Sequence, residues 1–188
     1  DCLLSRGLGD VYKRQIKKCA EAGHEAGALV IVDNTFATPV NQNPLKLGAD
    51  LVIHSATKFL GGHADALGGV VVGYDGSLVE AIYHYREING ATMDPWAAYL
   101  LLRGMKTLDL RVKRQAENAM KLATFLKKVE GVEQVFYPGL EDHPNHAIAK
   151  EQMSGFGGML SFAVAGGVDT VRHLLPKLQY ANLSLIHI

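Results

Sequence analysis

The chain has 188 residues, of which 48% are hydrophobic and 20% are charged. This composition is ordinary for a globular protein and excludes a disordered or collagen-like chain. The 19 basic residues balance the 19 acidic ones, so no net charge attracts nucleic acid or an anionic membrane, and we expect a small molecule or protein as partner. No apolar run reaches the roughly 18 residues that a membrane helix needs.

Cysteine usage and the two ends of the chain bear on its origin. Cys2 and Cys19 are too few for a disulfide framework and lack the paired spacing of a zinc site, which predicts a reducing, cytoplasmic setting and no metal.

Residues 1–15 have no clear period and no signal-peptide regions, and like residues 185–188 they resemble translated adapter sequence. We therefore expect both ends to be non-native and the rest to be an internal piece of a longer enzyme.

The first half of the chain predicts a helix followed by a buried strand. Residues 16–27 place apolar and small side chains at helical spacing, and Gly27 stands at the expected helix end. The apolar run 28–33 predicts a central strand of a parallel sheet, buried on both faces. Its last residue, Asp33, lies where ligands of α/β sheets bind, although it could instead begin an Asx turn with Asn34.

A loop and two further strands follow. Pro39 and Pro44 make residues 35–48 a loop rather than a long helix. Residues 49–54 predict the second strand. The short, glycine-rich link after it favours a reversal over a crossover helix, so the third strand, residues 70–72, is expected to run antiparallel to its predecessor.

The second half predicts helices around a further pair of strands. Asp94 and Pro95 mark a helix start, and residues 108–129 form a longer amphipathic helix whose lysines and arginines fall on a solvated face. Asp169 is expected to cap a last helix that Pro176 interrupts. The two further strands are expected over residues 132–136 and 158–165.

The most informative stretch is residues 50–63, DLVIHSATKFLGGH. An apolar run stops abruptly at two hydroxyls, a lysine and a glycine pair, which is typical of a strand that delivers polar groups to a site. Apolar neighbours around Lys58 disfavour its ammonium form, and a neutral lysine is a nucleophile towards carbonyls. The alternative is a lysine just past a strand end that points into water.

Lys58 and Asp33 at the ends of neighbouring strands could hold one cofactor between them. A lysine that forms an imine with an aldehyde cofactor needs a carboxylate across the ring, because a protonated pyridine nitrogen makes the ring an electron sink. Asp33 could be that carboxylate, and Ser55 and Thr57 offer hydroxyls for a phosphate. The four residues together predict pyridoxal phosphate.

Three motifs carry a resemblance to a known family. Asp33-Asn34-Thr35, residues 55–63 and residues 101–108 (LLRGMKTL) strongly resemble the cysteine and methionine metabolism (trans-sulfuration) family of pyridoxal phosphate enzymes. That family includes cystathionine γ-synthase, cystathionine γ-lyase, methionine γ-lyase and O-acylhomoserine sulfhydrylases. The resemblance covers about residues 16–184, with one departure at Ala64, where the family usually has Ser, Gly, Asn or His.

The resemblance implies a role for each candidate residue. Lys58 would hold the cofactor as an imine and carry protons, Asp33 would pair with its pyridine nitrogen, and Ser55 and Thr57 would bind its phosphate. The implied fold is α/β and aspartate aminotransferase-like (pyridoxal phosphate fold type I), with a mostly parallel sheet. The implied assembly is a homotetramer of active dimers.

The resemblance also implies domains and an activity. Residues 16–109 would be the C-terminal part of the cofactor domain, and residues 110–184 the start of a small α/β domain. The expected reaction is γ-elimination or γ-replacement on sulfur amino acids or activated homoserine. Ser184 could match a family serine near the substrate carboxylate. The family's phosphate turn and its substrate-binding arginine would lie outside this chain, so we expect the chain alone to be inactive.

Other hypotheses remain open. Ser55-x-x-Lys58 matches the nucleophile motif of penicillin-binding proteins, which needs a serine that opens a helix. A relative that keeps the scaffold for subunit contacts only would have no chemical need for the four candidate residues. The stretch His143–His146 resembles a metal site but lacks a third ligand, which predicts a polar surface loop. His54 and His63 flank the lysine, and a buried, hydrogen-bonded histidine is the better interpretation of His54.

Overall fold

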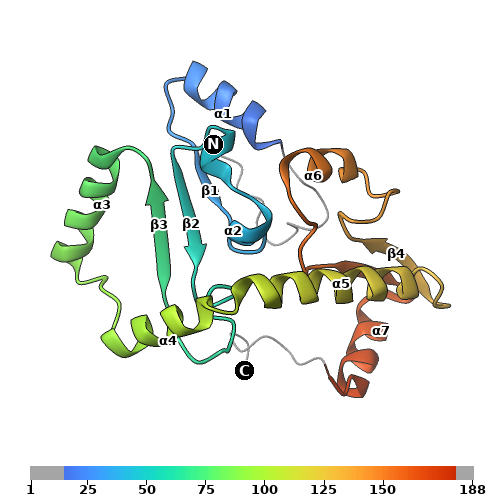
Figure 1. Cartoon of the computed structure of the whole chain (residues 1–188). Coiled ribbons are helices and arrows are strands. Elements are labelled where there is room, and N and C mark those ends of the chain that lie inside the picture. The colour runs from blue at the N-terminus through green and yellow to red at the C-terminus, as the bar shows by residue number, and fades with distance from the viewer. Residues whose placement is uncertain (1–14, 181–188) are drawn as a thin grey trace.

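The structure is a computed structural model and describes residues 15–180. Three predictions fall outside the described residues. They are the foreign ends at residues 1–14 and 185–188 and the substrate contact of Ser184. Within the described part, a three-stranded sheet lies at one end and a two-stranded sheet at the other, with one long helix running between them (Figure 1).

The described residues form helices and strands in mixed order, with two short 3₁₀ turns, η1 and η2, among them. In chain order they are α1 (Ile16–Glu25), β1 (Ile31–Asp33), α2 (Thr38–Asn41), η1 (Pro44–Leu47), β2 (Leu51–Ser55), β3 (Gly69–Gly73), α3 (Gly76–Asn89), α4 (Pro95–Met105), α5 (Leu108–Leu126), β4 (Val132–Phe136), α6 (His146–Gln152), β5 (Ser161–Val164), α7 (Gly167–Leu174) and η2 (Leu175–Lys177).

The larger sheet has the order β1-β2-β3. β1 pairs with β2 in parallel, with Asp33 opposite Ile53, and β2 pairs with β3 antiparallel, with Ser55 opposite Gly69. The predicted reversal after the second strand is therefore confirmed. The described part of the sheet combines one parallel and one antiparallel pair.

The position of β1 differs from the prediction of a central strand buried on both faces. Among the described residues β1 is an edge strand that pairs with β2 alone. Leu29 and Ile31, in and just before it, are 56% and 44% exposed. The prediction was wrong for this part of the chain. An apolar run indicates that a strand is usually buried, but no described segment pairs with the free edge of β1.

The starts of helices α2, α3, α6 and α7 were not anticipated, and those of α3 and α7 have clear physical reasons. α3 begins after Asp75, whose carboxylate accepts a hydrogen bond from the Ser77 backbone N–H at 2.8 Å, and it ends at Gly90 with φ +69°. These are ordinary cap signals that the sequence analysis did not use. α7 begins after Gly166, which makes no side-chain cap, so Asp169 lies in the first turn of α7 and does not cap it.

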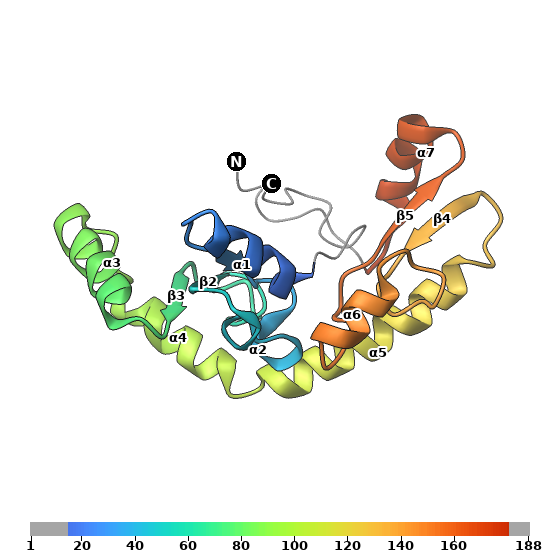
Figure 2. The same ribbon diagram turned by 90° about the horizontal axis from the view of Figure 1, so that it is seen from above.

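α4 and α5 follow each other along one side of the molecule (Figure 2). α4 begins as predicted, with Asp94 accepting hydrogen bonds from the N–H groups of Trp96 and Ala97. α5 contributes to two hydrophobic cores at its two ends. The first core consists of Ala56, Leu60, Leu101, Leu108 and Val112, and the second of Ala119, Ala123, Tyr137 and Leu140.

Candidate active site

The carboxyl ends of β1 and β2 lie side by side. The backbone N–H of Asn34 donates to the carbonyl of Ile53 at 2.9 Å. The Thr35 hydroxyl accepts a hydrogen bond from the backbone N–H of Ser55 at 2.8 Å. Since Asp33 pairs with Ile53, and residues two apart share a face of a strand, Asp33 and Ser55 lie on the same face of the sheet.

Asp33 begins an Asx turn, as the local interpretation of the sequence suggested. Its Oδ1 accepts a hydrogen bond from the Thr35 backbone N–H at 3.0 Å, whereas Oδ2 makes no hydrogen bond among the described residues. Behind it, the buried Asn34 side chain donates to the backbone carbonyl of Gln42 and accepts a hydrogen bond from Gln42 Nε2, both at 2.9 Å, and these two bonds fix the loop. The turn therefore orients the exposed Asp33 carboxylate and leaves one of its oxygens available.

Lys58 lies in the tight turn that follows β2, which we call the lysine turn (residues 56–62). The Gly61 N–H donates to the Ala56 carbonyl at 2.9 Å, and the Gly62 N–H donates to the Lys58 carbonyl at 2.8 Å. Gly62 has φ +76°, a conformation that glycine adopts at no steric cost. The Lys58 side chain is half-buried and forms no ion pair within the described part of the chain, so its amine is available for chemistry.

A cavity of about 900 Å³ lies beside the lysine turn. Thr57, Lys58 and Phe59 line it from the turn, and Phe36 lines it from the loop after β1. The rings of Phe36 and Phe59 meet edge to face with their centroids 6.1 Å apart. This contact joins the two loops at the cavity wall, so the cavity opens at the carboxyl ends of the two parallel strands.

The four predicted cofactor residues divide into two pairs. Lys58 and Thr57 line the cavity, whereas Asp33 and Ser55 lie at the neighbouring strand ends and are not part of its wall. Thr57 Oγ1 accepts a hydrogen bond from the Gly68 N–H at 3.2 Å, which leaves its hydroxyl proton free to donate. The Ser55 hydroxyl makes no hydrogen bond among the described residues.

The two histidines that flank the lysine turn differ in environment. His54 is buried, and its Nδ1 has no hydrogen-bond partner in the described structure, so the prediction of a hydrogen-bonded buried histidine is wrong at that atom. Burial lowers the pKa of His54, and the nearby Asp33 carboxylate opposes this in part, so His54 is neutral at pH 7. His63 is exposed, and its Nδ1 bonds to the Gly61 carbonyl at 2.7 Å.

Arg111 and Gln115 line the same cavity from α5, although the sequence analysis assigned the arginines of this helix to a solvated face. Arg111 is half-buried and donates to the carbonyls of Phe59 at 3.0 Å and Gly104 at 2.9 Å. The prediction is therefore wrong for Arg111. A signal for both residues was present, because they follow Leu108 by three and seven positions, the spacing of the buried stripe.

The stretch His143–His146 forms hydrogen bonds rather than a metal site. The described residues contain no group of three side chains that could hold a metal ion. The His146 Nδ1 bonds to the Pro138 carbonyl at 2.8 Å, and its ring stacks on Phe156 with centroids 5.2 Å apart. His143 is 6% exposed, so the prediction of a surface loop is wrong for this residue.

The hypothesis of an acyl-transfer serine is contradicted by the local structure. That motif requires a serine at the start of a helix, where the helix N-terminus and the lysine activate it. Ser55 is instead the last residue of strand β2, and residues 56–60 form turns. The hydroxyl of Ser55 therefore lacks the setting of a nucleophile of that class.

Comparison with known proteins identifies the family. The model of the Cys/Met metabolism PLP-dependent enzymes matches residues 11–185. The chain belongs to this family. The match confirms the resemblance that the lysine motif carries, and it makes pyridoxal phosphate the cofactor against which the cavity has to be tested.

Relatives within the Cys/Met metabolism family have several activities in their names. Cystathionine gamma-synthase 1, chloroplastic, from Nicotiana tabacum is 53% identical over 156 residues, which cover 83% of this chain and 29% of that protein. L-methionine gamma-lyase from Fusobacterium nucleatum subsp. polymorphum is 47% identical over 159 residues, which cover 84% of this chain and 40% of that protein.

A solved structure shows the same fold. Cystathionine gamma synthase from Xanthomonas oryzae pv. oryzae, in complex with aminoacrylate and cysteine, matches with a TM-score of 0.87 at 44% identity. The match covers 90% of this chain and 44% of that one, so the chain spans less than half the length of these family members. The predicted α/β fold of pyridoxal phosphate fold type I is confirmed.

The residues present fit the family's cofactor. The cavity volume of about 900 Å³ lies within the range of small-molecule sites. Lys58 contributes an amine without an ion-pair partner among the described residues, Thr57 a hydroxyl proton, and Asp33 a carboxylate oxygen at the adjacent strand end.

No helix of the described residues is both long and apolar enough to cross a membrane.

Proposed function

We propose that the full-length protein is a pyridoxal phosphate-dependent trans-sulfuration enzyme that catalyses γ-elimination or γ-replacement on sulfur amino acids or activated homoserine. One observation carries the proposal: Lys58 and Thr57 line a single cavity at the carboxyl ends of β1 and β2. Ligands of open α/β sheets bind outside these strand ends. Membership of the Cys/Met metabolism family supports the same chemistry.

Each candidate residue has a role in this proposal. Bound pyridoxal phosphate supplies a pyridine ring that stabilises negative charge on the substrate carbon. The Lys58 amine would hold the cofactor through its aldehyde group and would move the substrate α-proton as a general base and acid. The Asp33 carboxylate would keep the ring nitrogen protonated, and the hydroxyls of Ser55 and Thr57 would hold the phosphate.

Assays of the known substrates of the family can identify which of them this enzyme uses. Methionine γ-lyase and O-acylhomoserine sulfhydrylase activities are the alternatives to the cystathionine reactions. Relatives named for synthase and for lyase activity are 53% and 47% identical to this chain over the matched residues. Parallel assays of the full-length enzyme with cystathionine, O-acylhomoserine and methionine distinguish these branches.

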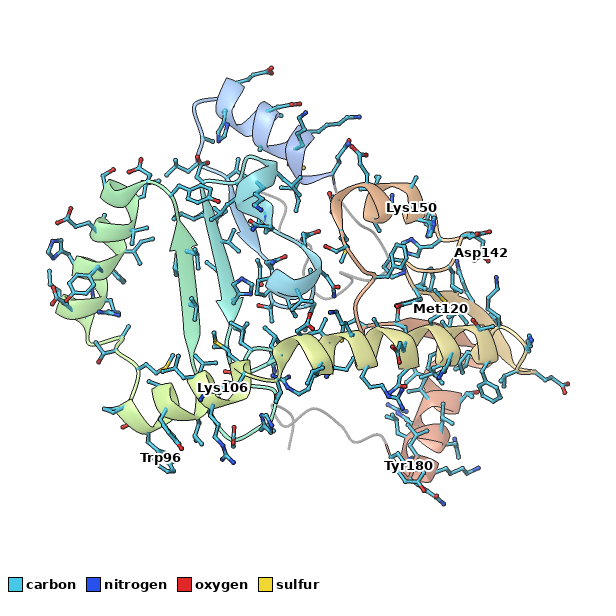
Figure 3. The ribbon with its side chains drawn as sticks, viewed as in Figure 1. Trp96, Lys106, Met120, Asp142, Lys150 and Tyr180 are labelled. Carbon is cyan, nitrogen blue, oxygen red and sulfur yellow. The ribbon has the colours of Figure 1, made fainter. Side chains whose placement is uncertain are left out.

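We also propose that the enzyme is a cytoplasmic homotetramer. Trp96 lies near the start of α4 (Figure 3) and stacks on Tyr99 with the ring centroids 5.4 Å apart. The two rings are 67% and 54% exposed, and Leu102 on the same helix is 64% exposed. Exposed apolar patches of this kind support subunit contacts. Cys19 is a free thiol, as expected in a reducing compartment. Sedimentation of the full-length protein tests the tetramer.

The domain division remains part of the proposal. Residues 16–109 would belong to the cofactor domain and residues 110–184 to the small C-terminal domain. The two separate cores at the ends of α5 support this division. The boundary falls in the first turn of α5, so we expect α5 to be a rigid connection between the domains.

The deciding experiment uses the full-length protein. It should be yellow, as expected of a protein that holds pyridoxal phosphate through a lysine. Borohydride should then fix the cofactor to Lys58, which peptide mass spectrometry detects. A colourless protein, or label on another residue, contradicts the proposal. Labelling of Ser55 by a β-lactam would instead support acyl transfer.

A further inference from the structure

The side chain of Arg111 connects the lysine turn to the junction of α4 and α5. Its Nη1 donates to the carbonyl of Phe59 at 3.0 Å, and its Nη2 donates to the carbonyls of Leu60 at 3.4 Å and Gly104 at 2.9 Å. Its Nε donates to the Thr107 hydroxyl at 3.0 Å. Each of the three guanidinium nitrogens therefore has an acceptor, and two of the carbonyls belong to the residues that follow Lys58.

Glycines make this close approach possible. A Cβ atom on Gly62 would overlap the Arg111 guanidinium, and one on Gly104 would overlap the Gly61 carbonyl. The backbone of α4 and the lysine turn are thus in direct contact where Arg111 reaches them. No side chain of the turn stands between Arg111 and the carbonyls that it binds.

Among the described residues, the guanidinium of Arg111 donates to three backbone carbonyls and to the Thr107 hydroxyl, all of them neutral groups. Within the described residues Arg111 forms no ion pair with a carboxylate, and burial lowers its pKa. Hydrogen bonds from a charged donor are stronger than those between neutral groups. The planar guanidinium presents its donors in a fixed fork that can span several carbonyls at once, whereas the compact ammonium of lysine cannot.

We propose that Arg111 is a positioning residue that holds the lysine turn so that the Lys58 amine stays at the cavity. The inference rests on the function proposed above, because it concerns the same amine. Arg111 acts through the backbone of Phe59 and Leu60, and Leu60 is also anchored in the first core. Loss of the guanidinium would free the chain directly after Lys58 while leaving that core anchor in place.

The test compares three variants of the full-length enzyme. Arg111→Gln removes the charge and the fork, Arg111→Lys keeps the charge, and Arg114→Gln is the matched control, since Arg114 is exposed on the same helix and pairs with Glu117 at 3.2 Å. Amide hydrogen exchange of residues 56–62 is measured without cofactor. The pH midpoint of the cofactor band, kcat and KM are measured with it.

For Arg111→Gln we expect amide exchange in the lysine turn to be about tenfold faster or more, because local opening becomes easier. Misplacement of the reacting amine should lower kcat by about 100-fold. KM should change little, and the pH midpoint of the cofactor band should shift. Arg111→Lys should recover part of each effect, and Arg114→Gln should match the wild type.

Unchanged exchange and an unchanged pH midpoint in Arg111→Gln would overturn the inference, even with a lower kcat. Should Arg111→Gln fail to fold, Arg111→Lys is judged by the same two measurements, and wild-type values for both would overturn it as well. A wild-type protein without a cofactor band contradicts the proposed function. A wild-type holoenzyme with unperturbed Arg111 variants contradicts only the positioning role.

Discussion

The two halves of α5 pack into different cores and serve different parts of the molecule. The N-terminal half contributes Leu108 and Val112 to the first core, which contains Leu60 of the lysine turn. The C-terminal half contributes Ala119 and Ala123 to the second core, which contains no residue of the turn or of the cavity wall. The first core therefore both stabilises the fold and anchors the lysine turn, whereas the second core stabilises a part of the fold that does not include the turn.

The largest effect should come from Lys58, which lies in the turn that the first core anchors. Lys58→Ala in the full-length enzyme removes both the covalent attachment and the proton carrier, and we expect kcat to fall by about 1000-fold or more. Borohydride should no longer fix the cofactor. Lys106→Ala is the matched control, because Lys106 is exposed at the end of α4 and does not line the cavity (Figure 3). Persistent labelling in Lys58→Ala would contradict the assignment.

A pair of core substitutions tests the comparison directly. Leu60→Ala in the first core and Leu140→Ala in the second should each lower the free energy of unfolding by about 2–5 kcal/mol, because both side chains are buried. Urea unfolding measures this loss. Only Leu60→Ala should also accelerate amide exchange in the lysine turn. Equal acceleration by both variants would show that the two cores are not independent.

The second core also makes a pH prediction. The buried Tyr137 hydroxyl donates to the Gly157 carbonyl at 2.9 Å, and burial raises the pKa of Tyr137 to about 12 from its ordinary 10.0. Because the folded state holds the phenol proton more tightly, this contribution to stability is complete below pH 10 and is lost as the pH rises towards 12.

Tyr137→Phe tests that prediction. At pH 7 it should lower the free energy of unfolding by about 0.5–1.5 kcal/mol through the lost hydrogen bond. Urea unfolding at several pH values should show the difference from the wild type shrinking above pH 10, with an unchanged cofactor band at pH 7. A difference that stays constant to pH 12 would contradict the raised pKa.

The smallest effect concerns Ala64, at the edge of the cavity. Its φ of +56° is the left-handed conformation that a β-carbon disfavours. Ala64→Gly should raise the free energy of unfolding by about 0.5 kcal/mol, since the relief of strain exceeds the greater entropy of the unfolded chain. Ala66→Gly is the control, because Ala66 does not have a positive φ, and it should destabilise the protein. A lower stability of Ala64→Gly would contradict this explanation.

Sequence prediction was accurate where the interactions are local. The reversal before β3, the start of α4 at Asp94 and the stripe of α5 depend on turn residues, a cap and a helical period, each of which acts over a few positions. α3 was missed although Asp75 and Gly90 marked its ends. The capping residues at both ends of α3 therefore predict this helix from the sequence.

Prediction of the site was less complete. The lysine motif led to the family and to a cavity lined by Lys58 and Thr57. Asp33 and Ser55 lie beside that cavity rather than in its wall, and Arg111 was assigned to solvent. β1 was expected to be central and is an edge strand among the described residues. The assignment of Asp33 and Ser55 to the cofactor stays a prediction. The errors at Arg111 and β1 both concern what a segment packs against, and the sequence of that segment alone does not contain this information.

The sequence by itself determined which functional groups are present: an amine, two hydroxyls and a glycine turn within a few positions, and a carboxylate at the end of an earlier strand. These features follow from short-range sterics and hydrogen bonding. Only the tertiary structure decided that Arg111 contacts the backbone of Phe59, 52 residues away, and that the first core lies beneath the lysine turn. Such contacts arise when distant segments pack together, so no local pattern specifies them.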